Sequence, residues 1–245
     1  MIVKGIDCAT RITKTVADKL KASGYMVAAR YLPGTSKNMT AEEAQILSDT
    51  GRLILSIYET TADRAKGGAL NGKQDGADAL RLAKALRMPE HGYIYFAVDY
   101  DAPLSDMPTI ASYLQAAREA AQPYKIGVYG GYRVIEYAGE RGLCDGYWQA
   151  YAWSYGKVSQ YATARQISAP QSVAGISADL NEIYSYQGLW NYNTTAESIA
   201  LSDKLQLNSP DYWGRVMQGK AALSPGNLKA LMQKAADYSI NRLFE

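Results

Sequence analysis

The sequence predicts an α/β fold, and within that class a closed (β/α)8 barrel of the TIM type with a short helical appendage at its C-terminal end. Eight strand-like segments precede residue 181, and most are followed by an amphipathic segment. The length of 245 residues is close to the roughly 250 that such a barrel needs. Residues 92–98 are apolar at almost every position, which is typical of a parallel-sheet strand buried on both faces.

The first half of the chain predicts four strands, each followed by a helix. The strands are expected at residues 1–7, 25–31, 52–58 and 92–99. The segment 11–23 has apolar residues four positions apart and ends before Gly24, so it predicts a helix. Thr40 begins a capping box that predicts a second helix to residue 50. Residues 60–73 predict a polar loop containing glycines, and a third helix is expected at 74–87.

The second half predicts four more strands with fewer helices. These strands are expected at residues 124–129, 146–153, 160–167 and 176–180, with helices at 107–122 and 132–141. Helices between the last three strands are missing or very short. A doubly wound open sheet is the alternative, but no glycine-rich phosphate-binding loop follows the first strand, which favours the barrel.

The composition changes after residue 179, where three helices are expected at 197–207, 209–219 and 224–243. Ser-Pro pairs begin the last two, as is common at helix N-termini. We therefore predict a barrel domain over residues 1–195 and a helical appendage over residues 205–245. The appendage is too short to build its own core. It is expected to pack on the barrel, on a second copy of the chain or on a partner.

Composition disfavours several classes of protein. The net charge is only +2 without a cluster of Lys or Arg, so no nucleic-acid partner is expected. The single His91 and the separated Cys8 and Cys144 show no metal-ligand spacing, so we expect no metal and no cofactor. We also expect no signal peptide and no membrane span. The 20 tyrosines against 2 phenylalanines suit a cleft that binds sugars, but equally an ordinary barrel rim.

Acidic residues gather where the predicted strands end, and these are Asp7, Glu59, Asp99, Asp101 and Asp179. In a barrel the C-terminal strand ends meet at one mouth, so the carboxyl groups should converge there. If the fourth strand continues to Asp101, Asp99 and Asp101 also point to the same face. Converging like charges cost stability, which favours a catalytic use. The alternatives are that Asp99 and Asp101 only cap a turn, and that Arg30 neutralises one of the acids.

Four short motifs resemble a known group of proteins. They are Gly5-Ile6-Asp7, Tyr58-Glu59, Ala97-Val98-Asp99-Tyr100-Asp101 and Ala178-Asp179-Leu180-Asn181. Their order and strand-end placement resemble the glycoside-hydrolase-like barrels of the domain of unknown function 1906, which are relatives of the family 25 lysozymes. The resemblance covers about residues 1 to 190. It implies a barrel that cleaves the bond between N-acetylmuramic acid and N-acetylglucosamine in peptidoglycan.

The resemblance also implies roles for the acids. Asp7, Asp99 and Asp179 match the family's supporting acids, whereas Asp101 stands where the lysozymes have a catalytic Glu. An Asp is one methylene shorter, which places its carboxyl group about 1.5 Å further back, and a misplacement of about 1 Å can lower the rate roughly a hundredfold. We expect Asp101 or Glu59 to donate the proton and Asp99 to be the ionised partner, with Asp7 and Asp179 orienting them.

The predicted function is therefore a peptidoglycan-active glycosidase that works at the cell wall or outside the cell. Five aromatic residues could stack on sugar faces or equally well pack in the core: Tyr31, Tyr58, Tyr129, Trp148 and Trp153. One alternative is a barrel that binds glycan or cell wall without cleaving it, which the departure at Asp101 favours. Another is an assembly protein that oligomerises through its C-terminal helices.

Overall fold

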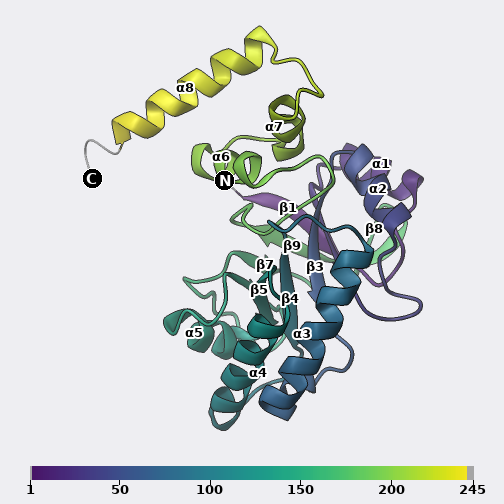
Figure 1. The fold of residues 1–245 in the computed structure, drawn as a ribbon, viewed down its shortest axis with the longest axis vertical. Coiled ribbons are helices and arrows are strands. Elements are labelled where there is room, and N and C mark those ends of the chain that lie inside the picture. The colour runs from purple at the N-terminus through teal and green to yellow at the C-terminus, as the bar shows by residue number, and fades with distance from the viewer. Residues whose placement is uncertain (1, 242–245) are drawn as a thin grey trace.

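The computed structural model describes residues 2–241, and its central feature is a closed barrel of eight strands (Figure 1). The barrel strands are β1 (Val3–Asp7), β2 (Val27–Tyr31), β3 (Leu53–Tyr58), β4 (Tyr93–Val98), β5 (Lys125–Gly130), β6 (Gly146–Gln149), β7 (Ala164–Gln166) and β9 (Ile176–Ile183). Neighbours from β1 to β7 pair in parallel, and β9 pairs with β1 to close the ring. The predicted barrel is confirmed, although β6 and β7 are shorter than expected.

The last barrel strand runs in the opposite direction to the one that we predicted. β9 is antiparallel to both β7 and β1, whereas the sequence analysis treated residues 176–180 as a parallel eighth strand. The physical reason is an unpredicted strand, β8 (Gln171–Val173), which forms a hairpin with β9. Ala174 and Gly175 join the two with φ of 55° and 90°, as a two-residue hairpin turn requires. The hairpin replaces the helical crossover of a parallel connection.

Five helices cover the outside of the barrel (Figure 1). They are α1 (Lys14–Ala22), α2 (Ala41–Asp49), α3 (Gly68–Ala85), α4 (Met107–Ala120) and α5 (Tyr132–Glu140). Outward side chains of the strands, including Ile54, Ile94 and Val128, pack in one core cluster with apolar residues of these helices. The five predicted helices are thus confirmed, with ends within three residues of the expected ones except at the start of α3.

Helix α3 begins inside the segment that we predicted to be a loop. A short 3-10 turn, η1 (Arg64–Gly67), leads directly into it. A Cβ atom on Gly72 would lie 2.1 Å from the Tyr113 carbonyl oxygen, and one on Gly76 would lie 2.6 Å from the Ala117 carbonyl oxygen. These glycines therefore allow α3 and α4 to pack closely. The sequence pattern alone placed Gly72 in the predicted loop, whereas Gly76 lies within the predicted helix 74–87.

Inward side chains fill the barrel. On β3, Leu53, Leu55 and Ile57 belong to the inner cluster, whereas the alternate residues face the helices. Tyr95 and Trp148 also lie in the inner cluster, with ring centroids 6.3 Å apart in an edge-to-face arrangement. The barrel is therefore a packed core that opens only near its end.

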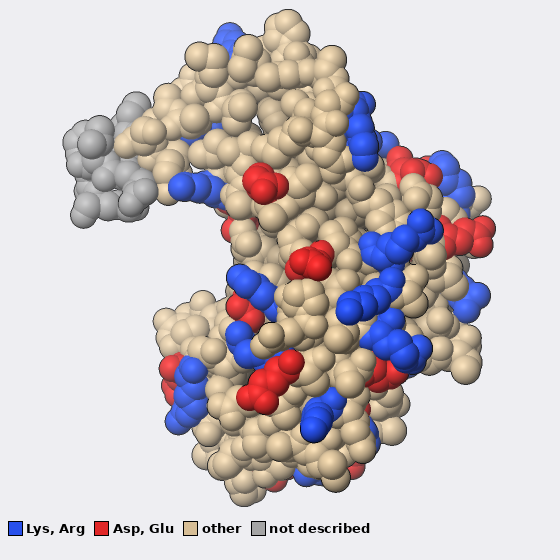
Figure 2. Space-filling model, viewed as in Figure 1, with Lys and Arg blue, Asp and Glu red and all other residues tan. Residues whose placement is uncertain are grey.

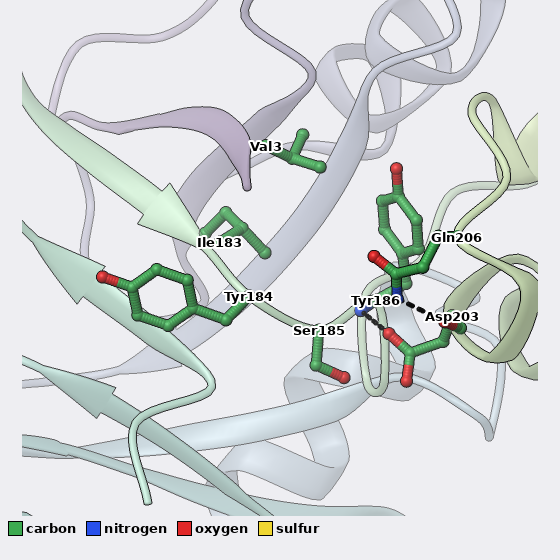
Figure 3. Close-up of a pocket in the computed structure, with 7 residues that line it drawn as sticks. All are labelled: Val3, Ile183, Tyr184, Ser185, Tyr186, Asp203 and Gln206. Atoms are coloured by element: carbon green, nitrogen blue, oxygen red, sulfur yellow. Dashed lines mark hydrogen bonds between the residues drawn. The ribbon is translucent and has the colours of Figure 1, made fainter. Parts of the chain in front are cut away.

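The C-terminal helices lie at the end of the barrel where the parallel strands begin. They are α6 (Ala196–Leu205), α7 (Pro210–Met217) and α8 (Pro225–Asn241), and the predicted end of the last helix near Leu243 lies outside the described residues. Ile199 of α6 belongs to the inner cluster. The backbone N–H of Tyr186 donates to Asp203 Oδ1 over 2.6 Å, joining α6 to the chain after β9 (Figure 3). The hollow shown there holds only about 10 Å³, room for about one water molecule.

Charged side chains are interspersed on the face shown in Figure 2, and few of them lie over the C-terminal helices at the top. Within residues 2–241, none of the helices combines the length and the apolar character needed to cross a bilayer.

Candidate active site at the barrel mouth

Four of the five predicted acids line one cavity of about 310 Å³ at the C-terminal end of the parallel strands. Asp7 is the last residue of β1, and Glu59 and Asp99 each follow directly after β3 and β4. Asp179 lies in the first half of β9. Because β9 is antiparallel to β1, this half lies beside the C-terminal end of β1, at the same mouth. The cavity is lined by Asp7, Tyr31, Ile57, Glu59, Asp99, Tyr129, Trp148, Tyr151, Ala152, Gln166, Ser168, Ala169, Pro170 and Asp179.

Asp7 and Asp179 form a coupled pair of carboxyl groups. They lie opposite each other in the β1–β9 ladder, and their side chains share a hydrogen bond. Burial raises the pKa of Asp7, and hydrogen bonds from Asn181 and Gln166 oppose part of that effect. Burial and the charge of Asp7 raise the pKa of Asp179 to about 7. Protonation of this pair is therefore favoured at higher pH than for an isolated Asp.

Two amide side chains, which the sequence analysis did not select, hold Asp7 in place. Asn181 Nδ2 and Gln166 Nε2 donate to Asp7 Oδ2 over 2.7 and 3.1 Å. Asn181 Oδ1 accepts from Trp148 Nε1 over 2.8 Å, and Gln166 Oε1 accepts from the Tyr129 hydroxyl over 3.3 Å. Trp148 and Tyr129 thus line the cavity and also fix the amides that orient Asp7. The available signal for Asn181 was its position two residues after Asp179, on the same face of a strand.

Asp99 is a second acid whose protonated form is favoured. Burial is the main cause, and the charges of Glu59 and Asp7 add to it, while Lys37 opposes them. Together they raise the pKa of Asp99 to about 6. Its backbone N–H donates to the Ala62 carbonyl over 3.0 Å, which fixes the position of the residue at the strand end.

Glu59 has a cation beside it. Lys37 Nζ lies 3.4 Å from Glu59 Oε1 and 4.0 Å from the centroid of the Tyr31 ring. The ammonium group therefore compensates the charge of Glu59 at the edge of the cavity, next to an aromatic ring. Neighbouring acids in this cavity thus have different surroundings, which is the arrangement that separates an acid from a base.

Asp101 lies outside this cavity. The expectation that it shares a strand face with Asp99 is wrong, because β4 ends at Val98. The Asp101 side chain is exposed, accepts a hydrogen bond from the Tyr155 hydroxyl and lies 3.6 Å from Arg133 Nη1. It lines a different hollow of about 450 Å³. A catalytic role for Asp101 stays a prediction.

Arg30 and two of the predicted sugar-stacking residues, Tyr58 and Trp153, do not line the cavity either. Tyr58 is on the outer face of β3, where its hydroxyl donates to Asp78 Oδ2 over 3.2 Å. Trp153 is half-buried in the loop after β6 and is not among the cavity-lining residues. Arg30 also faces outward, with Nε 2.6 Å from Glu43 Oε1, so its proposed pairing with a cavity acid is wrong. Strand alternation explains both outward positions, because Tyr58 and Arg30 each immediately precede an inward residue.

Among residues 2–241, no three His, Cys, Asp or Glu side chains are grouped so that they could hold a metal ion.

Comparison with protein families gives one match that covers most of the chain. The family described as "Rv2525c-like, glycoside hydrolase-like domain" matches residues 18–185. The chain is 29% identical over 191 residues to "Putative peptidoglycan hydrolase Rv2525c" of Mycobacterium tuberculosis, covering 71% of this chain and 79% of that protein. It is 33% identical over 159 residues to the uncharacterized protein FadG of Bacillus subtilis, covering 57% of this chain. The matches span only 27% of FadG and 21% of the related B. subtilis protein YbfG.

Solved structures show the same fold. The crystal structure of the Tat-secreted M. tuberculosis protein Rv2525c, in complex with L-tartrate, has a TM-score of 0.67 and 26% identity, covering 74% of this chain and 94% of that one. The modular autolysin LytC of Streptococcus pneumoniae has a TM-score of 0.56 and 17% identity, covering 74% and 46% of the two chains. The likeness to LytC concerns the fold alone.

Proposed function

Because the chain belongs to the Rv2525c-like glycoside hydrolase-like family, we propose that it is a glycoside hydrolase that cleaves the glycan strands of peptidoglycan. The observation that carries this proposal is the cavity at the barrel mouth, lined by Asp7, Glu59, Asp99 and Asp179. Its volume of about 310 Å³ lies at the lower end of the roughly 300–1,000 Å³ typical of small-molecule sites. The name of the M. tuberculosis relative supports peptidoglycan as the substrate class.

We assign the two chemical roles to Asp99 and Glu59. Glycoside hydrolysis needs one carboxyl group that donates a proton to the leaving oxygen and one that is ionised. With a pKa of about 6, Asp99 keeps a protonated fraction at mildly acidic pH, and Lys37 beside Glu59 compensates a negative charge there. This division reverses the one expected from the resemblance, in which Asp99 was the ionised partner. Asp7 and Asp179 would orient the sugar.

The aromatic walls suit a sugar substrate. Tyr31 is half-buried beside Lys37, and the more deeply buried Tyr129 and Trp148 form part of the cavity lining. Aromatic rings offer flat apolar surfaces to sugar faces, and the carboxyl and amide groups between them can bind hydroxyl and acetamido groups. The Tat-secreted character of the M. tuberculosis relative supports a site of action at the cell wall or outside the cell.

The direct test is the release of soluble fragments with new reducing ends from purified peptidoglycan between pH 4 and 8. We expect release by the parent chain and none by Glu59→Gln, because the amide can neither transfer a proton nor carry a charge. Glu59→Gln should melt within a few degrees of the parent, since Glu59 is only partly buried. Lys14→Gln on exposed α1 is the matched surface control and should keep full activity. An active Glu59→Gln chain would remove Glu59 from the reaction.

A second function is favoured by one observation. Asp101 stands where the resembling lysozymes have a Glu, and it is held outside the cavity by Tyr155 and Arg133. A barrel altered in this way could bind glycan without cleaving it. Co-sedimentation with insoluble peptidoglycan in the absence of fragment release would select this binding function over hydrolysis.

A further inference from the structure

The loop that follows β6 places aromatic rings at the rim of the cavity. Tyr151 lines the cavity and is 53% exposed, and four residues later Tyr155 is 70% exposed. Large aromatic side chains exposed beside a cavity are candidates for ligand contact. We call residues 150–159 the rim loop, because Tyr151 and Ala152 within it line the cavity.

Hydrogen bonds hold the rim loop in one shape although its rings are exposed. The buried Ser154 hydroxyl donates to the Ala150 carbonyl over 2.7 Å and accepts from Gln149 Nε2 over 2.9 Å. Trp153 and Tyr155 have φ of 55° and 51°, the left-handed region that bulky residues adopt only when their surroundings impose it. The loop thus presents its side chains in a defined arrangement.

Asp101 fixes the outermost ring of the rim loop. The Tyr155 hydroxyl donates to Asp101 Oδ2, and this hydrogen bond raises the pKa of Tyr155. Arg133 Nη1 lies 3.6 Å from the other Asp101 oxygen. Since the hydroxyl is tethered while the side chain remains largely exposed, the faces of the ring are available to a ligand. Asp101 also lines the hollow of about 450 Å³, so the Tyr155 ring is tethered to a residue at the edge of a second concave surface.

We propose that the rim loop is a glycan-binding platform, on which Tyr155 stacks against a sugar outside the catalytic cavity. It extends the site by further sugar positions along the glycan strand. Asp101 is the positioning residue that holds the Tyr155 ring in place. This inference rests on the proposed function for its ligand class, alternating N-acetylglucosamine and N-acetylmuramic acid. It concerns binding, so it can be tested separately from cleavage.

The test measures binding of a disaccharide and a hexasaccharide of these sugars to the full chain carrying Asp99→Asn, which is expected to abolish turnover. In that background, Tyr155→Ala should weaken hexasaccharide binding about tenfold, the effect of losing one good stacking contact, and change disaccharide binding less than twofold. Asp101→Ala and Tyr155→Phe should each cause a smaller, similar loss, and the double variant should lose no more than either because they remove the same contact.

Conservative and matched variants separate positioning from damage to the fold. Asp101→Asn keeps an oxygen that accepts from Tyr155 and should restore most of the hexasaccharide affinity. The control is Tyr184→Ala, because Tyr184 also donates to a carboxylate, Glu182, but lies at the opposite end of the barrel. It should leave both affinities unchanged.

The outcomes distinguish the two proposals. Three results would each overturn the platform. Tyr155→Ala could lose affinity equally for the disaccharide and the hexasaccharide, or lose none for the hexasaccharide. The Asp99→Asn chain itself could bind both saccharides with equal affinity. Length-dependent binding that depends on Tyr155, together with no cleavage of peptidoglycan by the parent chain, would support the platform and overturn the proposed hydrolysis alone.

Discussion

At the scale of single residues, the cavity is governed by how many of its carboxyl groups can be ionised at once. The pKa values of Asp7, Asp99 and Asp179 are all raised, chiefly by burial and also by neighbouring acids. Each proton that the folded chain retains therefore relieves repulsion at the mouth. The same effect supplies a protonated acid at pH values where an isolated Asp would be fully ionised.

This residue-scale account predicts that Asp99→Asn becomes more stable relative to the parent as pH rises. The pKa of Asp99 is about 6 when folded, against 3.8 ordinarily, so between about pH 4 and 6 the folded parent binds more protons than the unfolded chain. Parent stability from this group is therefore lost as pH rises through that window. We expect a relative gain on the order of 1 kcal/mol by pH 7, after discounting for the exposed part of the side chain.

Thermal or urea unfolding of both chains from pH 4 to 8 measures the trend. Asp18→Asn on the exposed surface of α1 is the matched control for an Asp-to-Asn change. An Asp99→Asn chain that is less stable than the parent by roughly 1–3 kcal/mol at pH 7 would instead identify Asp99 as a structural hydrogen-bond acceptor.

The sequence predicted the strand-end acids because acidity and strand position are visible in it. Asp7, Glu59, Asp99 and Asp179 do meet at one mouth. It did not assign a role to the amides that hold Asp7. Asn181 could have been identified from its place two residues after Asp179 on the same strand face, whereas Gln166 carries no charge pattern to single it out. Tyr58 and Arg30 could have been excluded by counting, because strand side chains alternate and each directly precedes a cavity-lining residue, Glu59 and Tyr31.

At the scale of secondary-structure elements, the number of barrel strands was predictable, whereas the direction of the last one was not. Residues 176–180 have ordinary strand character, which is the same for parallel and antiparallel pairing. The direction of β9 depends on the tight turn at Ala174-Gly175, which joins it to β8. In the sequence this turn is only weakly indicated, because β8 is short. In the same way, the helix α3 begins within a glycine-containing segment because α4 packs against it. Tertiary contacts decided both features.

The contact between β2 and α2 leads to an element-scale prediction. Arg30 and Glu43 are both buried and form an ion pair of 2.6 Å, and Glu43 also accepts from the Ile12 backbone N–H over 2.9 Å. Arg30→Ala leaves the Glu43 charge uncompensated in the core, which should lower the free energy of unfolding by about 3–5 kcal/mol.

Urea unfolding measures this loss. The double variant Arg30→Met/Glu43→Leu removes both charges and should recover much of the stability. Its peptidoglycan cleavage should match that of the parent, because Arg30 faces away from the cavity. If Arg30→Ala lowered the free energy of unfolding by less than about 1 kcal/mol, the importance of the pair would be contradicted, because exposed ion pairs contribute that little.

At the scale of the whole molecule, the C-terminal helices and the cavity occupy opposite ends of the barrel. Ile199 of α6 belongs to the inner cluster, whereas the described side chains of α8 are exposed or half-buried. Leu231, Ala235 and Tyr238 of α8 pack against a small cluster around Trp213, and Lys204 Nζ of α6 lies 5.0 Å from the centroid of the Tyr238 ring. The division into a barrel domain of residues 1–195 and an appendage of residues 205–245 stays a prediction. Helix α6 contacts the barrel through Ile199.

These contacts predict that shortening the chain has graded effects. A chain ending at residue 221 lacks α8 and should melt within about 2–4 °C of the parent, equivalent to about 1 kcal/mol. A chain ending at residue 195 also lacks Ile199 and should lose considerably more stability, because the inner cluster becomes exposed.

Calorimetry of the two shortened chains gives the comparison, and light scattering of the longer one tests whether α8 mediates oligomerisation. Equal losses of stability in both would show that α8 is part of the core. A change of mass on removing α8 would support the assembly role considered from the sequence.

The central claim is that the carboxyl groups of the barrel mouth hydrolyse peptidoglycan, with Asp99 as the proton donor. The most direct measurement is the rate of reducing-end release from purified peptidoglycan by the parent and by Asp99→Asn, from pH 4 to 8. The account predicts that the parent rate falls as pH rises through about 6, where Asp99 loses its proton, and that Asp99→Asn has no activity at any pH. No release by the parent at any pH, or full activity in Asp99→Asn, would contradict it.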